Sequence, residues 1–219
     1  MMTLTAADGH KFQVFEAGNV NAPRGLILGQ EIFGVNQHIR ETAENLARFG
    51  YRVLVPALFD RAAPDITLGY TPQDVQEGIR LRAEIAPAQT LLDLEATAAS
   101  FGEARPVGMV GYCWGGSLAW VMATQTTQLK AASCWYGAQI IQTKDATPHC
   151  PVQMHFGAED HSIPAADVAA IQAAQPQAEI YVYAGAQHGF GCASRPSYSA
   201  PDHELALLRT LTFFAEHLR

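Results

Sequence analysis

A strand-to-helix junction at residues 106–125 constrains the fold of this chain more than any other feature. The apolar run 106–112 is typical of a buried strand, and the small and apolar residues at 114–125 are typical of a helix. Between them lies the pattern Gly-x-Cys-x-Gly, with Cys113 at its centre and Gly116 directly after it. Glycines on both sides allow a tight turn from which the central side chain projects. We expect a nucleophile elbow in which cysteine replaces the more usual serine.

The surroundings of Cys113 favour a reactive thiol. The helix that we expect to begin near Trp114 directs its N-terminus at the sulfur, which helps to lower the pKa of a thiol and to hold an oxyanion. A buried structural cysteine in a glycine-bearing turn would carry the same local pattern. The junction alone therefore leaves both interpretations open.

Strands and helices alternate along the chain, which predicts βαβ crossovers and a mostly parallel sheet with helices on both faces, an α/β fold. No internal repeat or Ser/Gly-rich linker interrupts the pattern, so we expect residues 1–219 to form a single domain. The expected strands are 25–30, 51–59, 106–112, 130–137, 151–157 and 179–185, and the expected helices are 37–48, 73–85, 88–101, 114–125, 164–174 and 202–217, the last with Asp202 as N-cap.

Composition excludes several classes of protein. With 48% hydrophobic and 16% charged residues, the chain is not a disordered protein, and its net charge of −7 argues against nucleic-acid or anionic-membrane partners. Four cysteines without a C-x-x-C pair fit neither a disulfide scaffold nor a zinc ribbon. We see no signal peptide and no apolar stretch of the ~18 residues that span a bilayer. The expected location is cytoplasmic, with free thiols.

Two further residues complete a candidate catalytic triad. Open α/β sheets bind ligands beyond the carboxyl ends of their strands. Asp160 directly follows the strand expected at 151–157, and His188 follows the one at 179–185. The order nucleophile, acid, histidine is typical of this kind of elbow. His188 would hydrogen-bond the Cys113 sulfur, and Asp160 would orient the imidazole and stabilise its charged form.

Alternatives exist for these partners. Asp160 fits a turn or a helix cap, and His188 fits a surface loop. His161 is a rival histidine, although one loop would then supply both acid and base. Residues 149–161 contain several metal-ligand types, but His155 lies in an expected strand and the spacing matches no common zinc pattern. We therefore expect no metal, and because nucleotide-binding glycine motifs are absent we expect no cofactor.

Four stretches of the sequence resemble the dienelactone hydrolase family of α/β hydrolases. The resemblance implies an α/β-hydrolase fold and a Cys-Asp-His triad that hydrolyses enol-lactones, such as dienelactones from the breakdown of chlorinated aromatics, without metal or cofactor. It also implies a monomer whose partner is a small-molecule lactone or ester. The stretches are Gln30–Gly34 (QEIFG), Gly111–Gly116 (GYCWGG), Gly157–Asp160 (GAED) and Gly185–Phe190 (GAQHGF).

The resemblance gives Glu31 a role that spacing alone does not. In the family the equivalent glutamate lies against the resting thiol and helps to take its proton when substrate binds. A carboxylate in an apolar cleft has a raised pKa that suits this role. We expect the oxyanion of the intermediate to be held by the backbone N–H groups of Trp114 and Ile32.

Substrate contacts are expected from arginines and aromatic residues. Family members that act on dienelactone bind its carboxylate through arginines, whose planar guanidinium suits that group. Arg80 and Arg82 fall in the segment that lines the family's pocket, and Arg195 follows His188 at an offset from the family pattern. Each arginine also fits a solvated surface charge. The aromatic residues that could wall the pocket are Phe33, Tyr70, Trp114, Trp135 and Tyr136.

Three classes of function follow. The first is a cysteine hydrolase of small lactones or enol esters, and the second is a general carboxylesterase or thioesterase with the same triad. The third is a non-enzymatic binding module that keeps the fold. The complete set of Cys113, Asp160, His188 and Glu31 argues against the third class.

Overall fold

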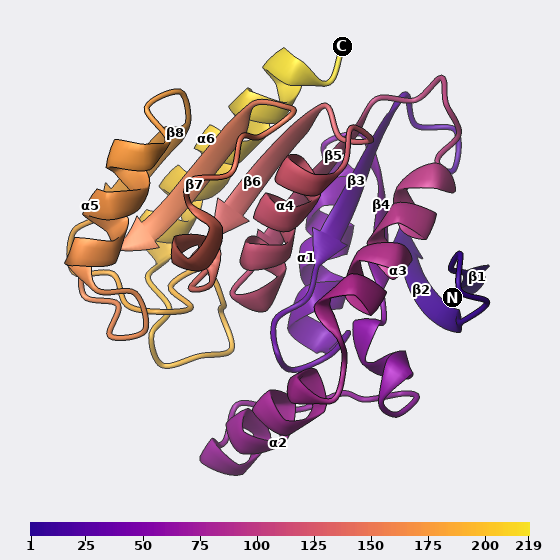
Figure 1. The fold of residues 1–219 in the computed structure, drawn as a ribbon, viewed down its shortest axis with the longest axis horizontal. Helices are drawn as coiled ribbons and strands as arrows, with labels where there is room; N and C mark the ends of the chain where they lie inside the picture. Colours follow the sequence, from indigo (N-terminus) through magenta and orange to yellow (C-terminus); the bar gives the residue numbers. More distant parts are fainter.

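Eight strands form one sheet in the computed structural model, which describes residues 1–219 (Figure 1). They are β1 (Met2–Thr5), β2 (Lys11–Ala17), β3 (Arg24–Gly29), β4 (Tyr51–Pro56), β5 (Val107–Tyr112), β6 (Ala131–Trp135), β7 (Val152–Gly157) and β8 (Glu179–Tyr183). Their order in the sheet is β1-β2-β4-β3-β5-β6-β7-β8. Strand β2 is antiparallel to both neighbours, and every other pair is parallel. The predicted mostly parallel sheet is confirmed.

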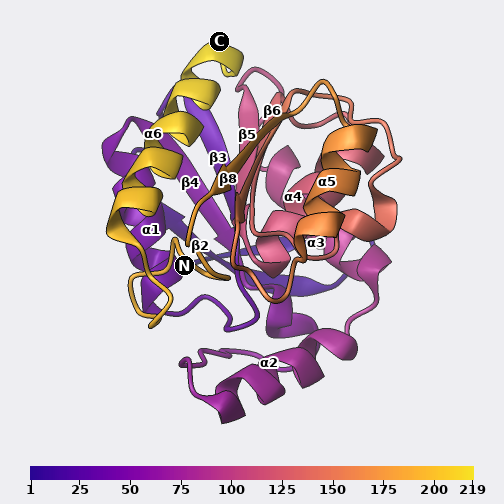
Figure 2. The same ribbon diagram turned by 90° about the vertical axis from the view of Figure 1, so that its left-hand side faces the viewer.

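Helices cover both faces of this sheet. They are α1 (Gln37–Arg48), α2 (Pro72–Ala83), α3 (Pro87–Ala99), α4 (Trp114–Gln125), α5 (Ala165–Ala174) and α6 (Ala200–His217), with short 3-10 turns η1 (Leu58–Arg61) and η2 (Ile140–Thr143). Figure 2 shows α1 and α6 on one face and α3, α4 and α5 on the other. Helix α2 lies beyond the carboxyl ends of the strands. No helix is both long and apolar enough to span a lipid bilayer.

Local signals explain where α1 begins and which side it buries. The side chain of Asn36 accepts a hydrogen bond from the Ile39 N–H, which caps the first turn. Ile39, Ala43 and Leu46 recur at helical spacing and are all buried against the sheet. This helix therefore has the bounds that the sequence predicts.

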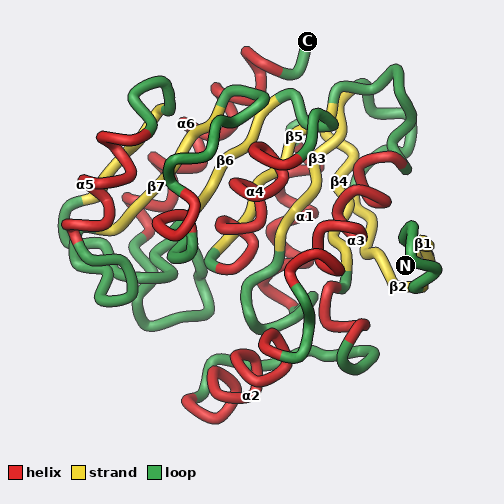
Figure 3. Tube along the Cα trace, in the orientation of Figure 1, coloured by secondary structure: helices red, strands yellow, loops and turns green.

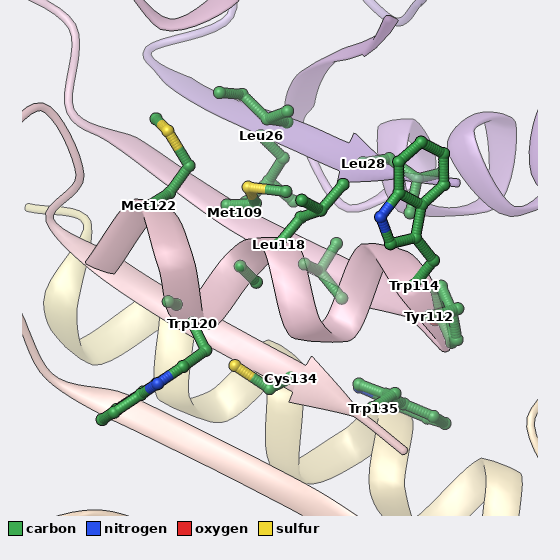
Figure 4. Packing of buried hydrophobic residues seen from close by; sticks show 14 of the residues in the cluster. Leu26, Leu28, Met109, Tyr112, Trp114, Leu118, Trp120, Met122, Cys134 and Trp135 are labelled. Atoms are coloured by element: carbon green, nitrogen blue, oxygen red, sulfur yellow. The ribbon is translucent and has the colours of Figure 1, made fainter. Parts of the chain in front are cut away.

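The core between β3, β5 and α4 is built from aliphatic and sulfur-containing side chains. Leu26 and Leu28 of β3 meet Met109 of β5, and Leu118 and Met122 of α4 close over them (Figure 4). Helix α4 is buried along most of its length, because it packs between the sheet and α3. This packing fixes the start of α4, where Cys113 lies.

Trp135 is a core residue, not part of a pocket wall. Its side chain is fully buried at the end of β6 (Figure 4), and its indole N–H donates to Thr210 Oγ1 at 3.2 Å. Thr210 belongs to α6, so this hydrogen bond joins the sheet to the helix behind it. Burial with a satisfied indole N–H is the usual structural use of tryptophan.

The structure differs from the sequence prediction at both ends of the chain. Strands β1 and β2 were not expected, and the strand expected at 51–59 ends at Pro56. Asp202 was predicted as the N-cap of the last helix, which is wrong. That helix begins at Ala200, and Asp202 lies within its first turn, where its carboxylate accepts a hydrogen bond from Ser199 Oγ at 2.6 Å.

The strand order favours ligand binding beyond the carboxyl ends of β3 and β5. The chain leaves β3 toward β4 on one side, whereas β5 lies on the other side, so the strand order reverses there. Open α/β sheets bind ligands beyond the carboxyl ends of the strands at such a point. In Figure 1 the arrowheads of β3, β6 and β7 point to the side where α2 and the loop after β8 lie. Figure 3 shows loops gathered beyond these ends.

Candidate active site

Cys113 occupies a strained turn between β5 and α4. Its φ of 56° and ψ of −111° are unusual for any residue other than glycine. A Cβ atom at Gly111 would lie 2.0 Å from the Gly115 carbonyl oxygen, and one at Gly115 would lie 2.2 Å from that of Gly29. The two glycines are therefore required for the turn to close, as expected of a nucleophile elbow.

Backbone hydrogen bonds tie this elbow to the neighbouring strands. The Cys113 N–H donates to the Trp135 carbonyl at 3.0 Å, and the Gly115 N–H donates to the Gln30 carbonyl at 2.9 Å. The buried side-chain amide of Gln30 also donates to the Glu31 carbonyl at 3.3 Å. The loop that carries Glu31 is thus fixed to the turn that carries Cys113.

The side chains of Cys113, His188 and Asp160 form one chain of hydrogen bonds. His188 Nε2 lies 3.2 Å from Cys113 Sγ, and its Nδ1 lies 2.8 Å from Asp160 Oδ2. Asp160 Oδ1 accepts a hydrogen bond from the Ser162 N–H at 2.8 Å. Ser197 Oγ donates to the His188 carbonyl at 2.7 Å, which steadies the loop after β8. The imidazole is therefore oriented between a thiol and a buried carboxylate.

The electrostatics of this chain favour a charged imidazole. Burial alone would lower the pKa of His188, but the negative charge of a Cys113 thiolate and the hydrogen bond to Asp160 raise it to about 10. An imidazolium beside the sulfur stabilises a thiolate, which is the nucleophilic form of cysteine. The ring of Tyr136 packs edge-on against the imidazole, with 5.1 Å between centroids, and restricts its movement.

The backbone N–H groups of Ile32 and Trp114 flank the elbow. Trp114 is the first residue of α4, so its N–H has no partner inside the helix. Neither N–H donates to a carbonyl in the turns, loops and helix caps. Helix α2 packs closely against the segment that carries Ile32, because a Cβ atom at Gly78 would lie 2.0 Å from the Ile32 carbonyl oxygen. Both groups can donate to a negative charge that develops in the crevice.

Comparison with known families agrees with this architecture. The sequence profile of the dienelactone hydrolase family matches residues 12–218, which is nearly the whole chain. The chain belongs to the dienelactone hydrolase family. It is accordingly a carboxylic ester hydrolase with the α/β-hydrolase fold.

Individual members of the dienelactone hydrolase family align over most of their length. A Synechocystis protein provisionally named as a carboxymethylenebutenolidase is 39% identical over 194 residues, covering 80% of this chain and 78% of that protein. The carboxymethylenebutenolidase of Pseudomonas putida is 32% identical, covering 98% and 95% of the two chains. The crystal structure of a protein provisionally titled a dienelactone hydrolase from Klebsiella pneumoniae has a TM-score of 0.84, with 31% identity and 97% of each chain covered.

Glu31 and Arg195 form a mostly buried ion pair beside the triad of this dienelactone hydrolase family member. Arg195 Nη1 lies 3.4 Å from Glu31 Oε1, and the side chains are 20% and 1% exposed. Burial raises the pKa of the Glu31 carboxyl, although Arg195 and His188 act against burial. The resemblance placed this glutamate against the resting thiol. The structure differs, because Glu31 makes no hydrogen bond to Cys113, whose sulfur contacts His188 instead.

Space for the Arg195 side chain comes from Gly189. A Cβ atom there would lie 2.4 Å from Arg195 Nη1, and the φ of Gly189 is 79°. Arg195 Cζ also lies 5.8 Å from the centre of the Phe33 ring, which supports the guanidinium from one side. Phe33 is itself buried and packs edge-on against Tyr70.

The structure does not bring Arg80 to the triad. Its side chain is 53% exposed on α2, where it forms ion pairs with Glu77 and Glu84. Two carboxylates at helical spacing already satisfy its guanidinium, which explains its position on the surface. Tyr136 is fully buried, so it touches His188 without lining an open cavity. Among the residues expected to bind substrate, Arg195 and Tyr70 line the cavity beside His188.

A cavity of about 370 Å³ opens beside His188. Arg195 is its only lysine or arginine, and the exposed His161 lies on its rim. His161 was the rival for the histidine position, but His188 is the residue that contacts both Cys113 and Asp160. The remaining lining residues are Tyr70, Glu159, Ser162, Gln187, Pro196 and Ser197.

Residues 149–161 do not gather into a metal site. His155 is fully buried, with one ring nitrogen 2.8 Å from Tyr183 Oη and the other 2.8 Å from Gln153 Oε1, and Asp160 is taken by His188. The set of potential metal ligands that does come together is Glu31, His38 and Cys192.

Several residues of the site were not singled out by the sequence. Ser197 and Gln30 position the loops of the site through backbone contacts. Neither belongs to a residue type or spacing that indicates chemistry on its own. The motif Gln30–Gly34 was the one available signal for Gln30, and nothing local marks Ser197.

Replacing Gly115 with alanine should destabilise the protein, because the added methyl group overlaps the Gly29 carbonyl. We expect a loss of about 1–3 kcal/mol in the free energy of unfolding, or more, measured by urea denaturation. Gly50→Ala is the control, since Gly50 has a φ of 87° but no atom within 4 Å of an added Cβ, so only about 1 kcal/mol of backbone strain is added. Equal losses in the two variants would contradict the argument.

Replacing Asp160 with asparagine should lower the pKa of His188 from about 10 toward its ordinary value of about 6.5. Folding raises this pKa, so the stability that His188 contributes is complete below about pH 6.5 and is lost as the pH rises through about 10. Ring-proton NMR titrations of His188 in the two proteins measure the shift. A pKa that is unchanged in the variant would show that Asp160 does not hold the charged imidazole.

Proposed function

We propose that this protein hydrolyses small enol-lactones, such as dienelactones, with Cys113 as nucleophile. The observation that carries the proposal is the hydrogen-bonded chain from Cys113 Sγ through His188 to Asp160, with distances of 3.2 and 2.8 Å. This chain lies at the carboxyl ends of the strands, beside the cavity that Arg195 lines. Membership of the dienelactone hydrolase family supports the same reaction class.

Acylation begins when the Cys113 sulfur, whose proton has passed to His188 Nε2, attacks the lactone carbonyl carbon as a thiolate. The 3.2 Å separation of these atoms is a hydrogen-bond contact, so His188 can take the proton directly. Asp160 stabilises the resulting imidazolium through Nδ1. The carbonyl oxygen becomes an oxyanion, which the N–H groups of Ile32 and Trp114 bind.

Collapse of this intermediate opens the ring. The carbonyl carbon forms a thioester with Cys113, and the bond to the ring oxygen breaks. The ring oxygen leaves as an enolate, which departs more readily than an alkoxide, and accepts the proton held on His188 Nε2, so that the imidazole becomes neutral. A thiolate nucleophile is therefore sufficient for this substrate class.

Deacylation returns the enzyme to its starting state. His188 takes a proton from water, whose oxygen attacks the thioester carbonyl. The bond to sulfur then breaks, the carboxylic acid is released, and Cys113 regains a proton. The net reaction consumes one lactone and one water, and needs neither metal nor cofactor.

Arg195 is proposed to select substrates that carry a carboxylate. It provides the positive charge of the cavity beside His188, and a guanidinium binds a carboxylate through two parallel hydrogen bonds. Glu31 holds Arg195 in place until substrate arrives. The proton-acceptor role of Glu31 requires its carboxylate to move toward Cys113 once Arg195 turns to the substrate. Such lactones arise in the degradation of chlorinated aromatics, and a cytoplasmic location suits a free thiol.

A general carboxylesterase or thioesterase activity is the second candidate. A groove of about 680 Å³ runs along α4 from Trp114, beside the proposed oxyanion site. Leu118 lines the groove from α4, and Ile85 and Leu91 line it from the turn before α3 and from α3 itself. An apolar groove in this position would accept an acyl chain larger than that of a dienelactone.

Replacing Cys113 with alanine should abolish turnover of a dienelactone and of a nitrophenyl ester, because no other group can form the acyl-enzyme. Steady-state rates and circular dichroism measure activity and folding. Cys150→Ala is the matched control, since Cys150 is also partly exposed but lies far along the chain from the elbow. Activity retained in the Cys113 variant would refute the proposed nucleophile.

Replacing Arg195 with methionine should lower kcat/KM for a carboxylate-bearing dienelactone by roughly 10- to 100-fold, the value of a hydrogen bond to a charged group. The rate with neutral nitrophenyl acetate should change much less. Arg80→Met is the control, because Arg80 is exposed and paired with glutamates. Equal losses on both substrates would argue against carboxylate recognition, and a nitrophenyl ester preferred throughout would favour the second candidate.

A further inference from the structure

A second cluster of reactive side chains lies behind the proposed catalytic site. Glu31 follows β3, His38 lies in the first turn of α1, and Cys192 belongs to the loop after β8. All three residues are buried, and each offers a ligand atom within 4.8 Å of the other two. No other group of histidine, cysteine, aspartate and glutamate residues in the protein meets this spacing.

Two atoms of this cluster have no hydrogen-bond partner. Glu31 Oε1 contacts Arg195, but Glu31 Oε2 is unpartnered, and so is Nε2 of His38. The two residues are at least nine-tenths buried, with exposed fractions of 0% and 7%. Buried polar atoms are normally hydrogen-bonded, so two orphans in one cluster require an explanation. A bound cation would satisfy both.

A cavity gives access to the cluster from the side of α1 and α6. It has a volume of about 160 Å³ and is lined by His38, Gly191 and Tyr112 among others. Gly191 directly precedes Cys192 in the chain. The cavity therefore reaches His38 and the two neighbours of Cys192 in the chain, Gly191 and Ala193, and it can supply both an ion and a water molecule.

The chemistry of the three groups matches a borderline divalent metal. Thiolate, imidazole and carboxylate together are ligands that Zn²⁺ accepts. Burial lowers the pKa of His38 to about 4, so its imidazole is neutral and able to coordinate at neutral pH. Burial raises the pKa of Cys192 to about 12, so its thiol must lose a proton to solvent as the sulfur–metal bond forms.

Charge and geometry also fit. A thiolate and a carboxylate neutralise a divalent cation, which removes the cost of placing a net charge in a buried site. Bonds of roughly 2.0–2.3 Å in a tetrahedral site place two ligand atoms about 3.3–3.6 Å apart. The ligand atoms lie within 4.8 Å of one another, and side-chain rotations that move each of them by about an ångström bring them to the tetrahedral separation. Arg195 stays on the opposite oxygen of Glu31.

We infer that Glu31, His38 and Cys192 form a Zn²⁺ site. Its fourth ligand is a water molecule from the cavity that His38 lines between α1 and α6, called the rear cavity below. The site goes beyond the proposed reaction, which uses no metal. Metal binding fixes the Glu31 carboxylate, so that it cannot move toward Cys113 to accept its proton, and this inhibits hydrolysis. This inhibitory consequence rests on the proposed function, whereas metal binding itself does not.

Binding is tested with Zn²⁺ alone by calorimetry on the Cys113→Ser variant, which removes the competing thiol of the triad. We expect one bound ion. His38→Gln and Cys192→Ser, each added to this variant, should weaken binding by at least about tenfold, since loss of even an outer-sphere partner costs 10- to 100-fold. His203→Gln is the matched control, because His203 also lines the rear cavity but lies outside the cluster. Circular dichroism checks that each variant is folded.

Cobalt provides an independent readout. Co²⁺ bound to the Cys113→Ser protein should show thiolate-to-metal charge-transfer absorption, and this absorption should disappear when Cys192→Ser is added. Absence of saturable Zn²⁺ binding, unchanged affinity in the His38 variant, or charge transfer that persists without Cys192 would each overturn the site.

Inhibition is measured with the wild-type chain and a nitrophenyl ester. Zn²⁺ should slow hydrolysis and a chelator should restore it, whereas His38→Gln should keep the metal-free rate and need at least about tenfold more Zn²⁺. Equal inhibition of both proteins would place the inhibitory ion on the triad and overturn the inhibitory role. Should Cys113→Ala prove fully active, the proposed function fails, but the calorimetric result still decides the metal site.

Discussion

The close approach of the N-terminus of α4 to the end of β3 is the contact on which the site depends. Gly115 packs against the Gly29 carbonyl with no room for a side chain, and its N–H is bound by the Gln30 carbonyl. One contact therefore fixes two loops at once, the turn that bears Cys113 and the segment that bears Glu31. The strain at the cysteine persists because the surrounding packing holds it.

Much of the fold could be predicted from the sequence, since buried strands and amphipathic helices leave strong periodic signals. Helices α1 and α4 have the bounds that their patterns predict. Strands β1 and β2 were missed because both are of mixed polarity, and their partly exposed side chains weaken the apolar signal. Asp202 was misplaced as a helix cap because Ser199, three residues earlier, also fits that position.

The site was predictable where function follows from position along the chain. Cys113, Asp160 and His188 each follow a strand, so one rule about parallel sheets brings them to a single edge. Arg80 shows the limit of such reasoning. It was expected at the substrate, but Glu77 and Glu84 lie three and four residues away on the same helix and bind its guanidinium at the surface. His38 was not recognisable at all, since its neighbours come from distant loops and only packing brings them together.

Glu31 turns its carboxylate toward two neighbourhoods, and this has a thermodynamic consequence. One oxygen holds Arg195 at the mouth of the site, while the other is left without a partner in the protein interior. A ligand that draws Arg195 away changes the charge available on the interior side, and a ligand on the interior side changes the hold on Arg195. Linkage requires the two effects to be equal in free energy. A single buried carboxylate thus makes the front and the rear of the molecule allosterically reciprocal.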